Sequence, residues 1–430
     1  MKTLLRCAIM RGMTQPSLVN RLKKGLPAEL ADFIETTARL ATEQGQKLYL
    51  VGGVVRDLLL AEPNSDLDLV VEGDAVELAR QLAELKQTKI TIHPRFMTAK
   101  LTWGEFSIDF TTARSETYAQ AGALPTVKPG SIEDDLFRRD FTINAMAICL
   151  NTHRYGELID RHGGKSDLEH RFIRVLHEKS FTDDATRIWR GLRYEQRLDF
   201  QLEEATLNLL KRDIAMLDTI SGDRIRYELE CIFAEAVPEK VLRRADELSV
   251  LERLHPALKG NSHLERSFEK AREQLSPTRP SIGLYLALLT HHLDSQEGDK
   301  LSSHLRLSKP LGQTVHDASV LKDKLKMLAY PELSASYVYR ILHRFSPVAI
   351  TAISLATTSP VARQHLEIYL RRLRYVNPIL KGADLLSMGF TPGPQVREVL
   401  TRLHEAKLDG KATTKQDEET LVKGWLANKT

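Results

Sequence analysis

At 430 residues, the chain is too long for a single hydrophobic core, so we expect several domains. A hydrophobic content of 42% and a charged content of 27% are typical of a globular protein, and we expect no membrane-spanning helix because no apolar run is long enough. The formal net charge of +4 is compatible with a polyanionic partner without requiring one, and three scattered cysteines argue against a disulfide framework and favour the cytoplasm.

The first 150 residues predict a mixed α/β domain. Alternating apolar and β-branched residues indicate strands over 47–53, 65–73, 89–103 and 106–112. Helical periodicity covers the segments 28–45, 54–60 and 75–85. Two glycines and two prolines predict a loop over 118–135, after which the sequence returns to regular structure.

From about residue 170 the sequence becomes helical. Amphipathic periods cover 183–198, 204–217, 223–234 and 239–248. Helical patterns then continue to the C-terminus, with interruptions at prolines. The fold class that we expect is therefore α+β, with a mixed sheet and its helices first and an all-α remainder after it.

Two carboxylates interrupt the predicted strand at SDLDLVV (65–71). On a strand, Asp66 and Asp68 would face the same side, where their like charges repel unless a cation lies between them. Carboxylate oxygens suit Mg²⁺, and Asp109 offers a third acid on another predicted strand. The pattern indicates a two-metal site for phosphoryl or nucleotidyl transfer, with an exposed strand edge or turn as the alternative.

Gly52 and Gly53 stand between a predicted strand and a predicted helix, and Arg56 follows one turn later. Glycine allows the backbone to approach a phosphate closely, and a helix N-terminus offers free N–H groups. The spacing matches neither a dinucleotide-binding motif nor a P-loop. Because the acidic pair follows Arg56 by only ten residues, we expect phosphate binding beside the metal site, with a plain turn as the alternative.

Two arginine-rich segments extend this candidate site. The stretch RRDFTINA (138–145) supplies Arg139 for triphosphate oxygens and Asn144 for a ribose or a base. The stretch DDATRIWRGLR spaces four charged side chains at three-residue steps on one helix face: Asp184, Arg187, Arg190 and Arg193. An Asp–Arg pair can hydrogen bond to the edge of a base, and a surface ion pair is the alternative.

Together these stretches resemble the bacterial class II tRNA nucleotidyltransferases, which comprise CCA-adding, A-adding and CC-adding enzymes and poly(A) polymerase relatives. The resemblance rests on LVGGVVRDLLL…SDLDLVV, EDDLFRRDFTINAMA, LIDRHGGKSDLEHRFIRVL, FTDDATRIWRGLRYEQRL and SGDRIRYELECIF, in family order over about residues 45–235. It implies a polymerase-β-like nucleotidyltransferase head, followed by a helical neck, body and tail.

The resemblance also implies roles for single residues. Asp66 and Asp68 match the metal-binding carboxylates, and Asp109 matches the acid on the neighbouring strand. The positions that match nucleotide-binding residues are Gly53, Arg56, Arg139, Arg190 and Arg193. Asp184 and Arg187 match the pair that selects CTP and ATP and rejects UTP and GTP, and Asp183 replaces the usual glutamate before them.

The domain boundaries that we expect follow the same scheme. They are an N-terminal extension (1–25), the nucleotidyltransferase head (26–150), a neck with the nucleotide-selecting motif (151–235), a body (236–345) and a tRNA-binding tail (346–430). The resemblance implies tRNA as the partner, bound through its acceptor and elbow, and Mg²⁺ with ATP, and possibly CTP, at the active site. No membrane association is expected.

The expected reaction is template-independent addition of CCA, or only its terminal A, to tRNA 3′ ends. In this reaction the 3′-hydroxyl attacks the α-phosphate of the nucleotide. The stretches RYEQRLDF and KGADLLSMGFTPGPQVREVL resemble A-adding members more than CCA-adding ones. A CC-adding enzyme or a poly(A) polymerase on the same scaffold is the alternative, and a non-catalytic RNA-binding protein is a more distant one. The stretch LLTHHLD (288–294) lacks the full ligand set of a metal-dependent phosphohydrolase.

Overall fold

In this computed structural model, the described residues are 18–64, 66–119, 122–123 and 125–427. The chain forms two compact units, Met1–Ile220 and Ser221–Thr430. Most of the expected N-terminal extension lies outside the described residues, and helix α2 (Leu18–Gly25) is the part of it that they include. No helix in the described ranges is long and apolar enough to cross a membrane.

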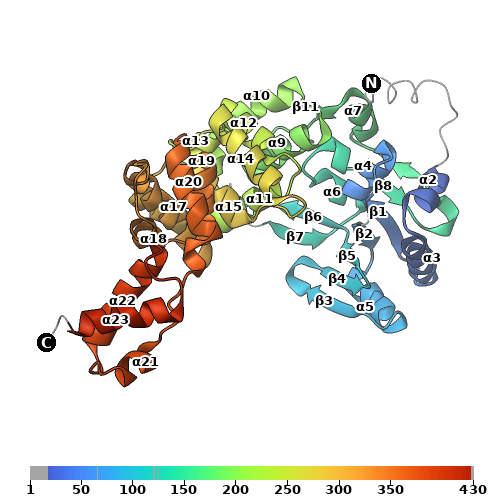
Figure 1. Cartoon of the computed structure of the whole chain (residues 1–430). Coiled ribbons are helices and arrows are strands. Elements are labelled where there is room, and N and C mark those ends of the chain that lie inside the picture. Colours follow the sequence, from blue (N-terminus) through green and yellow to red (C-terminus); the bar gives the residue numbers. More distant parts are fainter. Residues whose placement is uncertain (1–17, 65, 120–121, 124, 428–430) are drawn as a thin grey trace. The chain divides into compact units, whose positions relative to one another are not determined.

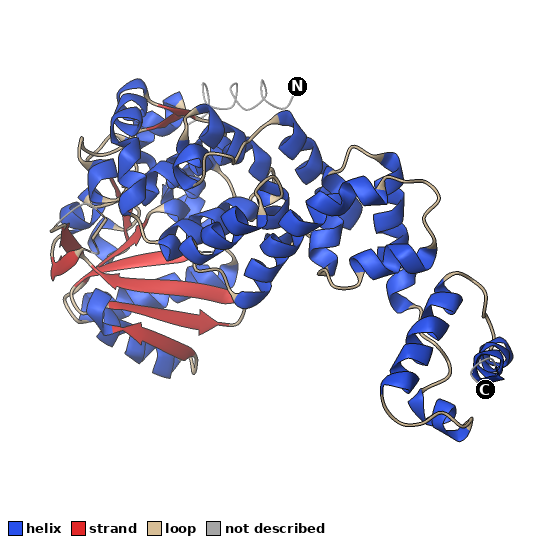
Figure 2. Cartoon of the chain, turned by 90° about the vertical axis from the view of Figure 1, so that its left-hand side faces the viewer, coloured by secondary structure: helices blue, strands red, loops and turns tan. Residues whose placement is uncertain are grey.

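The first unit contains a seven-stranded mixed sheet. Figure 2 draws the strands in red, and Figure 1 labels several of them. In sheet order, the strands are β3 (Lys89–His93), β4 (Thr98–Trp103), β5 (Phe106–Thr112), β2 (Leu67–Glu72), β1 (Lys47–Val51), β8 (Ala147–Cys149) and β9 (Leu158–Ile159). Strands β2 and β5 are parallel, and the other neighbours are antiparallel. A separate hairpin of β6 (Arg114–Thr117) and β7 (Thr126–Pro129) follows β5 in the chain.

Helices of the first unit pack against this sheet. Those in contact with its strands include α3 (Ala28–Glu43), α4 (Gly53–Leu60), α5 (Ala75–Leu85) and α6 (Ile132–Phe137). Further helical segments are η1 (Pro94–Phe96), η2 (Thr142–Asn144), η3 (Thr152–Arg154), α7 (Gly164–His170), α8 (Ser180–Asp183), α9 (Thr186–Leu198), α10 (Glu204–Asp213) and η4 (Ile214–Thr219). A short parallel pair, β10 (Phe172–Ile173) and β11 (Gln201–Leu202), lies among these helices in the sequence.

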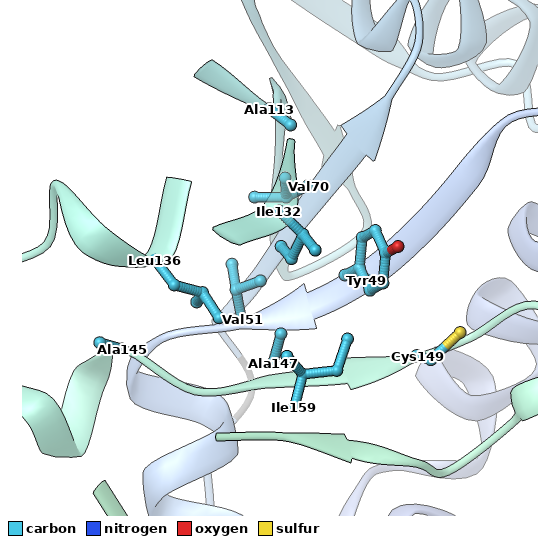
Figure 3. Packing of buried hydrophobic residues seen from close by; sticks show 10 residues of the cluster. All are labelled: Tyr49, Val51, Val70, Ala113, Ile132, Leu136, Ala145, Ala147, Cys149 and Ile159. Atoms are coloured by element: carbon cyan, nitrogen blue, oxygen red, sulfur yellow. The ribbon is translucent and has the colours of Figure 1, made fainter. Parts of the chain in front are cut away.

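The packing of α6 determines which face of the sheet carries the candidate site. Figure 3 shows Ile132 and Leu136 of α6 in one apolar cluster with Tyr49, Val51 and Val70 from strands β1 and β2. Side chains two residues apart on a strand share a face, so Asp68 lies on the same face of β2 as Val70. Helix α6 and the arginines that follow it are therefore held on the face that bears Asp68.

The second unit is helical in its described residues. Its helices are α11 (Gly222–Phe233), α12 (Pro238–Glu247), α13 (Val250–Leu254), α14 (Ser262–Leu275), α15 (Ile282–Thr290), α16 (Ser295–His304), α17 (Lys309–Leu328), α18 (Ala335–Leu342), α19 (Pro347–Ala356), α20 (Pro360–Arg371), η5 (Leu373–Tyr375), α21 (Gly382–Ser387), α22 (Pro394–Leu408) and α23 (Lys415–Ala427). Every residue of α15 after Ile282 is buried, and so are seven of the ten residues of α19, as expected for helices that are apolar on most sides.

A second apolar cluster organises the C-terminal helices. We call it the tail core, and its members are Leu380, Leu385, Phe390, Val399, Leu403 and Val422. These residues come from α21, α22, α23 and the segments beside α21, so three short helices share one core. The expected boundaries at residues 150, 235 and 345 stay predictions. The division into two compact units lies between Ile220 and Ser221.

The fold class and most of the predicted elements are confirmed, and three details are corrected. The strand predicted over 65–73 begins at Leu67, so Asp66 precedes it, and Ser65 lies outside the described residues. The loop predicted over 118–135 contains β7 and the start of α6, because Ser131 and Asp134 form a capping box that begins the helix despite the preceding Gly and Pro. Helix α9 begins at Thr186, so Asp184 precedes the helix that carries the three arginines.

Candidate active site

The register of the sheet brings two of the predicted carboxylates together. In the parallel pair of β2 and β5, Asp68 lies opposite Asp109, and in the antiparallel pair of β4 and β5, Asp109 lies opposite Lys100. All three side chains therefore point to the same face of the sheet. Lys100 Nζ lies 3.1 Å from Asp109 Oδ2, which gives this carboxylate a cationic partner.

Asp68 is the centre of an acidic cluster. Burial raises its pKa, and the nearby charges of Asp109 and Asp66 raise it further, while Arg139 and Lys100 oppose this shift. The charge of Asp66 therefore acts on Asp68 even though Asp66 is exposed and lies before β2. The three predicted acids share one electrostatic environment that favours an added cation.

The glycine turn contacts this acidic cluster through Gly52. Its backbone has φ 76°, a conformation that favours glycine, where β1 ends and α4 begins. A Cβ at this position would lie 2.8 Å from Arg139 Nη1 and 3.5 Å from Asp68 Oδ2. The absent side chain thus allows a guanidinium and a carboxylate to approach the same turn, and Gly53 opens the helix beside them.

A fully buried acid fixes both arginines of the RRD stretch. Arg139 donates to Asp135 Oδ2 from Nε and Nη2 at 3.2 and 2.9 Å, and Arg138 donates to Oδ1 at 3.0 and 2.6 Å. Burial alone would raise the pKa of Asp135, but the two guanidinium groups lower it below its ordinary value. Asp135 therefore stays ionised and orients Arg139 toward the glycine turn.

The β6–β7 hairpin is tied to this arginine pair. Glu116 Oε1 accepts hydrogen bonds from Arg138 Nη1 at 3.2 Å and from Arg114 Nη2 at 3.1 Å, and Tyr118 donates to Oε2 at 2.9 Å. Burial and the charge of Glu116 raise the pKa of Tyr118, whereas Arg187 opposes the shift. The hairpin therefore lies within electrostatic range of the predicted nucleotide-selecting arginine.

The structure places Arg56 in the interior, and its expected nucleotide-binding role stays a prediction. This residue is only 2% exposed, and its Nε and Nη2 donate to the carboxylate of Asp57 at 2.7 and 2.9 Å. Its Nη1 donates to Asn144 Oδ1 at 2.7 Å. Through these contacts the buried guanidinium of Arg56 braces helix α4 against η2.

Asn144 continues this network toward helix α9. Its Nδ2 donates to Asp140 Oδ1 at 3.0 Å, and Arg190 pairs with Asp140 Oδ2 through Nε at 2.8 Å and Nη2 at 2.6 Å. Burial alone would raise the pKa of Asp140, but Arg190 and Asn144 lower it to about 2. Asp140 thus links the end of the sheet domain to the arginine helix by hydrogen bonds on both of its oxygens.

The Asp184 and Arg187 side chains are each held by a local partner. Arg187 Nη1 donates to Ser180 Oγ at 2.6 Å, and Nη2 donates to the carbonyl oxygen of Arg138 at 2.7 Å. Asp184 Oδ1 accepts from the backbone N–H of Thr186 at 3.0 Å. These contacts fix Asp184 and Arg187, the predicted base-selecting pair, beside the RRD stretch.

Tyr194 gathers the remaining arginines. The guanidinium carbons of Arg193, Arg56 and Arg190 lie 4.9, 5.3 and 5.7 Å from the centre of its ring. Such cation–π contacts stabilise closely spaced positive charges against an aromatic face. Arg193 is 8% exposed, so Arg190 is the more accessible of these two residues of α9.

The carboxylates of Asp66 and Asp68 are chemically suited to binding a hard divalent cation. Mg²⁺ binds through one or two carboxylates together with water and substrate phosphates, and Asp66 and Asp68 offer oxygen ligands of this kind. Among the described residues, no three His, Cys, Asp or Glu side chains are gathered as a metal-binding group, and Asp109 is paired with Lys100. In the described part of the chain, the histidines of segment 288–294 also do not belong to any cluster of three or more potential metal ligands.

Two acids of the site escaped the sequence analysis as candidate site residues: Glu116 and Asp135. For Asp135 a signal was present, because it precedes Arg138 and Arg139 by three and four residues, the spacing at which side chains meet on a helix, but the sequence predicted a loop there. Asp140, in contrast, stands inside the RRD stretch that the sequence analysis assigned to the site. Glu116 joins the site only through the pairing of β6 and β7, which no local pattern indicated.

Comparisons with known proteins identify the family of the chain. Residues 48–174 match the family model of the "Poly A polymerase head domain", and residues 199–261 match the model "Probable RNA and SrmB- binding site of polymerase A". The A-adding tRNA nucleotidyltransferase of Halalkalibacterium halodurans is 31% identical, over 93% of this chain and 94% of that protein. The A-adding tRNA nucleotidyltransferase of Geobacter sulfurreducens is 34% identical, over 93% of this chain but only 48% of that protein, so the chain spans about half the length of this relative.

Solved structures resemble the chain over nearly its full length. A CCA-adding enzyme in its apo form II has a TM-score of 0.82 and 31% identity, covering 95% of this chain and 99% of that one. The Thermotoga maritima CCA-adding enzyme complexed with tRNA has a TM-score of 0.76 and 31% identity, covering 96% and 99%. Complexes of a CCA-adding enzyme with ATP and with CTP each have a TM-score of 0.80 and 30% identity, covering 96% and 99%.

The sequence motifs, the sheet register and these similarities point to one family. The chain belongs to the bacterial class II tRNA nucleotidyltransferase and poly(A) polymerase family.

Proposed function

We propose that the chain is a template-independent tRNA nucleotidyltransferase that adds the terminal A of the CCA end to tRNA. The A-adding relatives from Geobacter sulfurreducens, Aquifex aeolicus and Halalkalibacterium halodurans are 31–34% identical over 84–93% of the chain. The CCA-adding relatives from Bacillus cytotoxicus and Streptococcus sanguinis are 26% and 28% identical over 89–90% of the chain, and the CCA-adding enzymes of known structure are 30–31% identical. The A-adding relatives support A addition as the finer activity that we propose, and the CCA-adding enzymes make full CCA addition the alternative that the test must separate from it.

One observation carries the catalytic part of this proposal. At the Gly52 turn, the Arg139 guanidinium and the Asp68 carboxylate meet around a backbone position that has no side chain. A positive group and a cation-binding carboxylate beside a helix N-terminus are the elements that a nucleoside triphosphate requires. The site combines phosphate binding and acid ligands within a few ångströms.

The chain's own residues would divide the work as follows. Asp66 and Asp68 would hold Mg²⁺, and Asp109 would add a third carboxylate when Lys100 moves away from it. Arg139, oriented by Asp135, would bind triphosphate oxygens in front of Gly52 and Gly53. Bound Mg²⁺ supplies charge neutralisation at the phosphates and acidifies the attacking hydroxyl.

The reaction itself is a displacement at phosphorus. The tRNA 3′-hydroxyl oxygen forms a bond to the α-phosphorus of ATP, the bond from that phosphorus to the bridging oxygen of the β-phosphate breaks, and pyrophosphate leaves while the hydroxyl proton passes to solvent. The protein contributes position and charge, and no covalent enzyme intermediate is formed. Asp184 and Arg187 would select the base through hydrogen bonds, since the pair offers both an acceptor and donors.

The partner would be tRNA, with its acceptor end at the head and its elbow on the tail. The match of residues 199–261 to an RNA-binding model supports this assignment, as does the tRNA complex of the Thermotoga maritima relative. We place the reaction in the cytoplasm, because the relatives are bacterial tRNA-processing enzymes and the chain has few, scattered cysteines.

The test uses the full chain with Mg²⁺ and three tRNAs that end before the first C, after CC and after CCA, each with ATP or CTP alone. Incorporation of one A onto the CC-ended tRNA, and of nothing onto the others, is the expected result. Asp68→Asn should abolish this incorporation while tRNA binding persists.

Each other outcome identifies an alternative. Two C residues followed by one A would mark a CCA-adding enzyme, C addition alone a CC-adding enzyme, and long A tails on many RNAs a poly(A) polymerase. An absence of incorporation on every tRNA would overturn the enzymatic proposal and leave the non-catalytic RNA-binding protein.

A further inference from the structure

A short hydrogen-bonded bridge holds the segment that carries Asp66. The backbone N–H of Asp66 donates to Asn64 Oδ1 at 2.9 Å, and Asn64 Nδ2 donates to Asp57 Oδ2 at 2.7 Å. The side-chain amide of Asn64 therefore makes two hydrogen bonds: its oxygen accepts one from the backbone of Asp66, and its nitrogen donates one to Asp57 of helix α4. An asparagine suits this arrangement because it carries both an acceptor and donors on one planar group.

The far end of this bridge is anchored in the interior. Asp57 is 5% exposed and receives two hydrogen bonds from Arg56, which is 2% exposed. Arg56 in turn donates to Asn144, which donates to Asp140. Asn64 thus connects an exposed segment to a buried hydrogen-bond network. Because Asp57 and Arg56 are held in place by this network, they fix the position of Asn64.

Strand pairing leaves Asp66 without such support. The ladder of β2 begins at Leu67 on its β5 side and at Leu69 on its β1 side, so Asp66 lies outside both sets of backbone hydrogen bonds. Fixing a single residue in one conformation costs about 1–2 kcal/mol of entropy. The bond from Asn64 supplies a local constraint at the position where an oxygen ligand must be held.

We propose that Asn64 is a positioning residue that orients Asp66 for cation binding by fastening its backbone to Asp57. The proposal rests on the proposed function, since it assumes that Asp66 binds the catalytic cation. Asn64 itself would touch neither the cation nor the nucleotide. Residues that orient metal ligands through hydrogen bonds commonly change affinity by about 10–100-fold when they are removed.

The test compares Asn64→Leu, which keeps the approximate shape and removes both hydrogen-bonding ends, with Asn208→Leu on the exposed surface of α10. Mn²⁺ binding to the full chain is measured by electron paramagnetic resonance without nucleotide or RNA. We expect Mn²⁺ affinity to fall about 10–100-fold in Asn64→Leu and to stay unchanged in Asn208→Leu. Thermal unfolding midpoints of both variants should match that of the unchanged chain.

A kinetic readout separates positioning from general damage. In Asn64→Leu, kcat for nucleotide addition should fall while KM for ATP changes less than about twofold, and excess divalent cation should restore kcat. If Asn64→Leu binds Mn²⁺ and turns over like Asn208→Leu, the positioning role is wrong while the proposed function stands. If the unchanged chain binds no Mn²⁺ and adds no nucleotide, the proposed function fails, and this inference fails with it.

Discussion

Gly52 and Arg139 approach so closely that a Cβ on Gly52 would lie 2.8 Å from Arg139 Nη1, so a larger residue would have to displace the guanidinium. The same Cβ would lie 3.5 Å from Asp68 Oδ2, which is an ordinary contact distance. The absent side chain therefore leaves room for a guanidinium and a carboxylate at the same turn. The positive φ of Gly52, 76°, adds a second reason for glycine at this position.

Gly52→Ala should lower kcat/KM for nucleotide addition by about 100-fold, because a displacement near 1 Å at a reacting site has this order of effect. The new methyl group would push Arg139 away from the turn and strain the backbone. Steady-state kinetics with ATP and a CC-ended tRNA measure the loss. Gly45→Ala is the matched control, because Gly45 also has a positive φ, 67°, but no heavy atom within 4 Å of its added Cβ. An equal loss in both variants would show that backbone strain, not the Arg139 contact, causes the effect.

Arg187→Ala should loosen base choice more than it weakens tRNA binding. The change removes the donors that we assign to the incoming base, so the preference for ATP over GTP, UTP and CTP should fall by about 100-fold. Competition between nucleotides on a CC-ended tRNA gives this ratio. Ser180→Ala keeps the guanidinium and removes only its 2.6 Å hydrogen bond to Ser180 Oγ, so a loss of about tenfold is expected. Unchanged nucleotide preference in Arg187→Ala would contradict the selecting role.

Glu418→Ala should destabilise the tail by about 3 kcal/mol. The Glu418 side chain is 0% exposed, lies 2.7 Å from Lys407 Nζ, and accepts hydrogen bonds from the backbone N–H groups of Ile379 and Leu380 at 2.9 and 2.8 Å. Removal of one partner of a buried pair leaves the other charge and the amides without compensation. Amide hydrogen exchange over residues 379–427 should accelerate in proportion.

Glu419→Ala provides the matched comparison for Glu418. Glu419 pairs with Lys415 at 4.0 Å, with both side chains more than one third exposed. Surface pairs of this kind contribute about 0–1 kcal/mol, so exchange in the tail should be almost unchanged. Similar exchange rates in the two variants would refute the structural role of Glu418.

The second unit should lose stability as the pH falls from about 6.5 to about 4. Burial lowers the pKa of His291 to about 4, and the charges of His292, His263 and Lys322 act in the same direction. The unfolded chain binds this proton near the ordinary histidine pKa, about 6.5, and therefore takes up more protons than the folded chain between these limits. The contribution of the neutral His291 ring to the free energy of unfolding is therefore complete above about pH 6.5. It decreases by about 3 kcal/mol as the pH falls to about 4.

Urea unfolding at pH 7 and pH 4.5 measures this loss. His291→Gln removes the titrating group and keeps an N–H that can donate to the carbonyl oxygen of Leu288, which lies 2.8 Å from His291 Nδ1. The pH dependence should become shallower in this variant and stay unchanged in His153→Gln, which alters an exposed histidine. An unchanged slope in His291→Gln would contradict the assignment.

The sequence predicted the central elements of the fold because their patterns are local. The periodicity over 75–85 marked α5, and the alternation over 106–112 marked β5, with the same bounds as in the structure. The hairpin of β6 and β7 was missed because its partners are separated by a stretch with glycine and proline. Its pairing depends on contacts between distant residues, which a local pattern does not contain.

The candidate site was predicted by residue type, and the structure adds the burial and the partners of each side chain. The sequence places Arg56 one turn after the glycine pair, as a phosphate contact would require, yet the structure buries it against Asp57 and Asn144. Neighbouring charges decide such cases, and sequence spacing alone does not show which partner an arginine prefers. Asp68 and Asp109 lie side by side, as expected. The alternation of side chains along each strand places both carboxylates on one face of the sheet, and the parallel register of β2 and β5 places them opposite each other.

The turn between β4 and β5 consists of Gly104 and Glu105 and lies outside the active site. Its two-residue length nevertheless aligns Lys100 with Asp109, since the antiparallel register is counted from this turn. A register shift of one residue would bring a buried neighbour of Lys100, Ala99 or Leu101, level with the carboxylate instead. A change in the length of this remote turn that shifts the register would therefore remove the cationic partner of Asp109 without altering any residue of the candidate site.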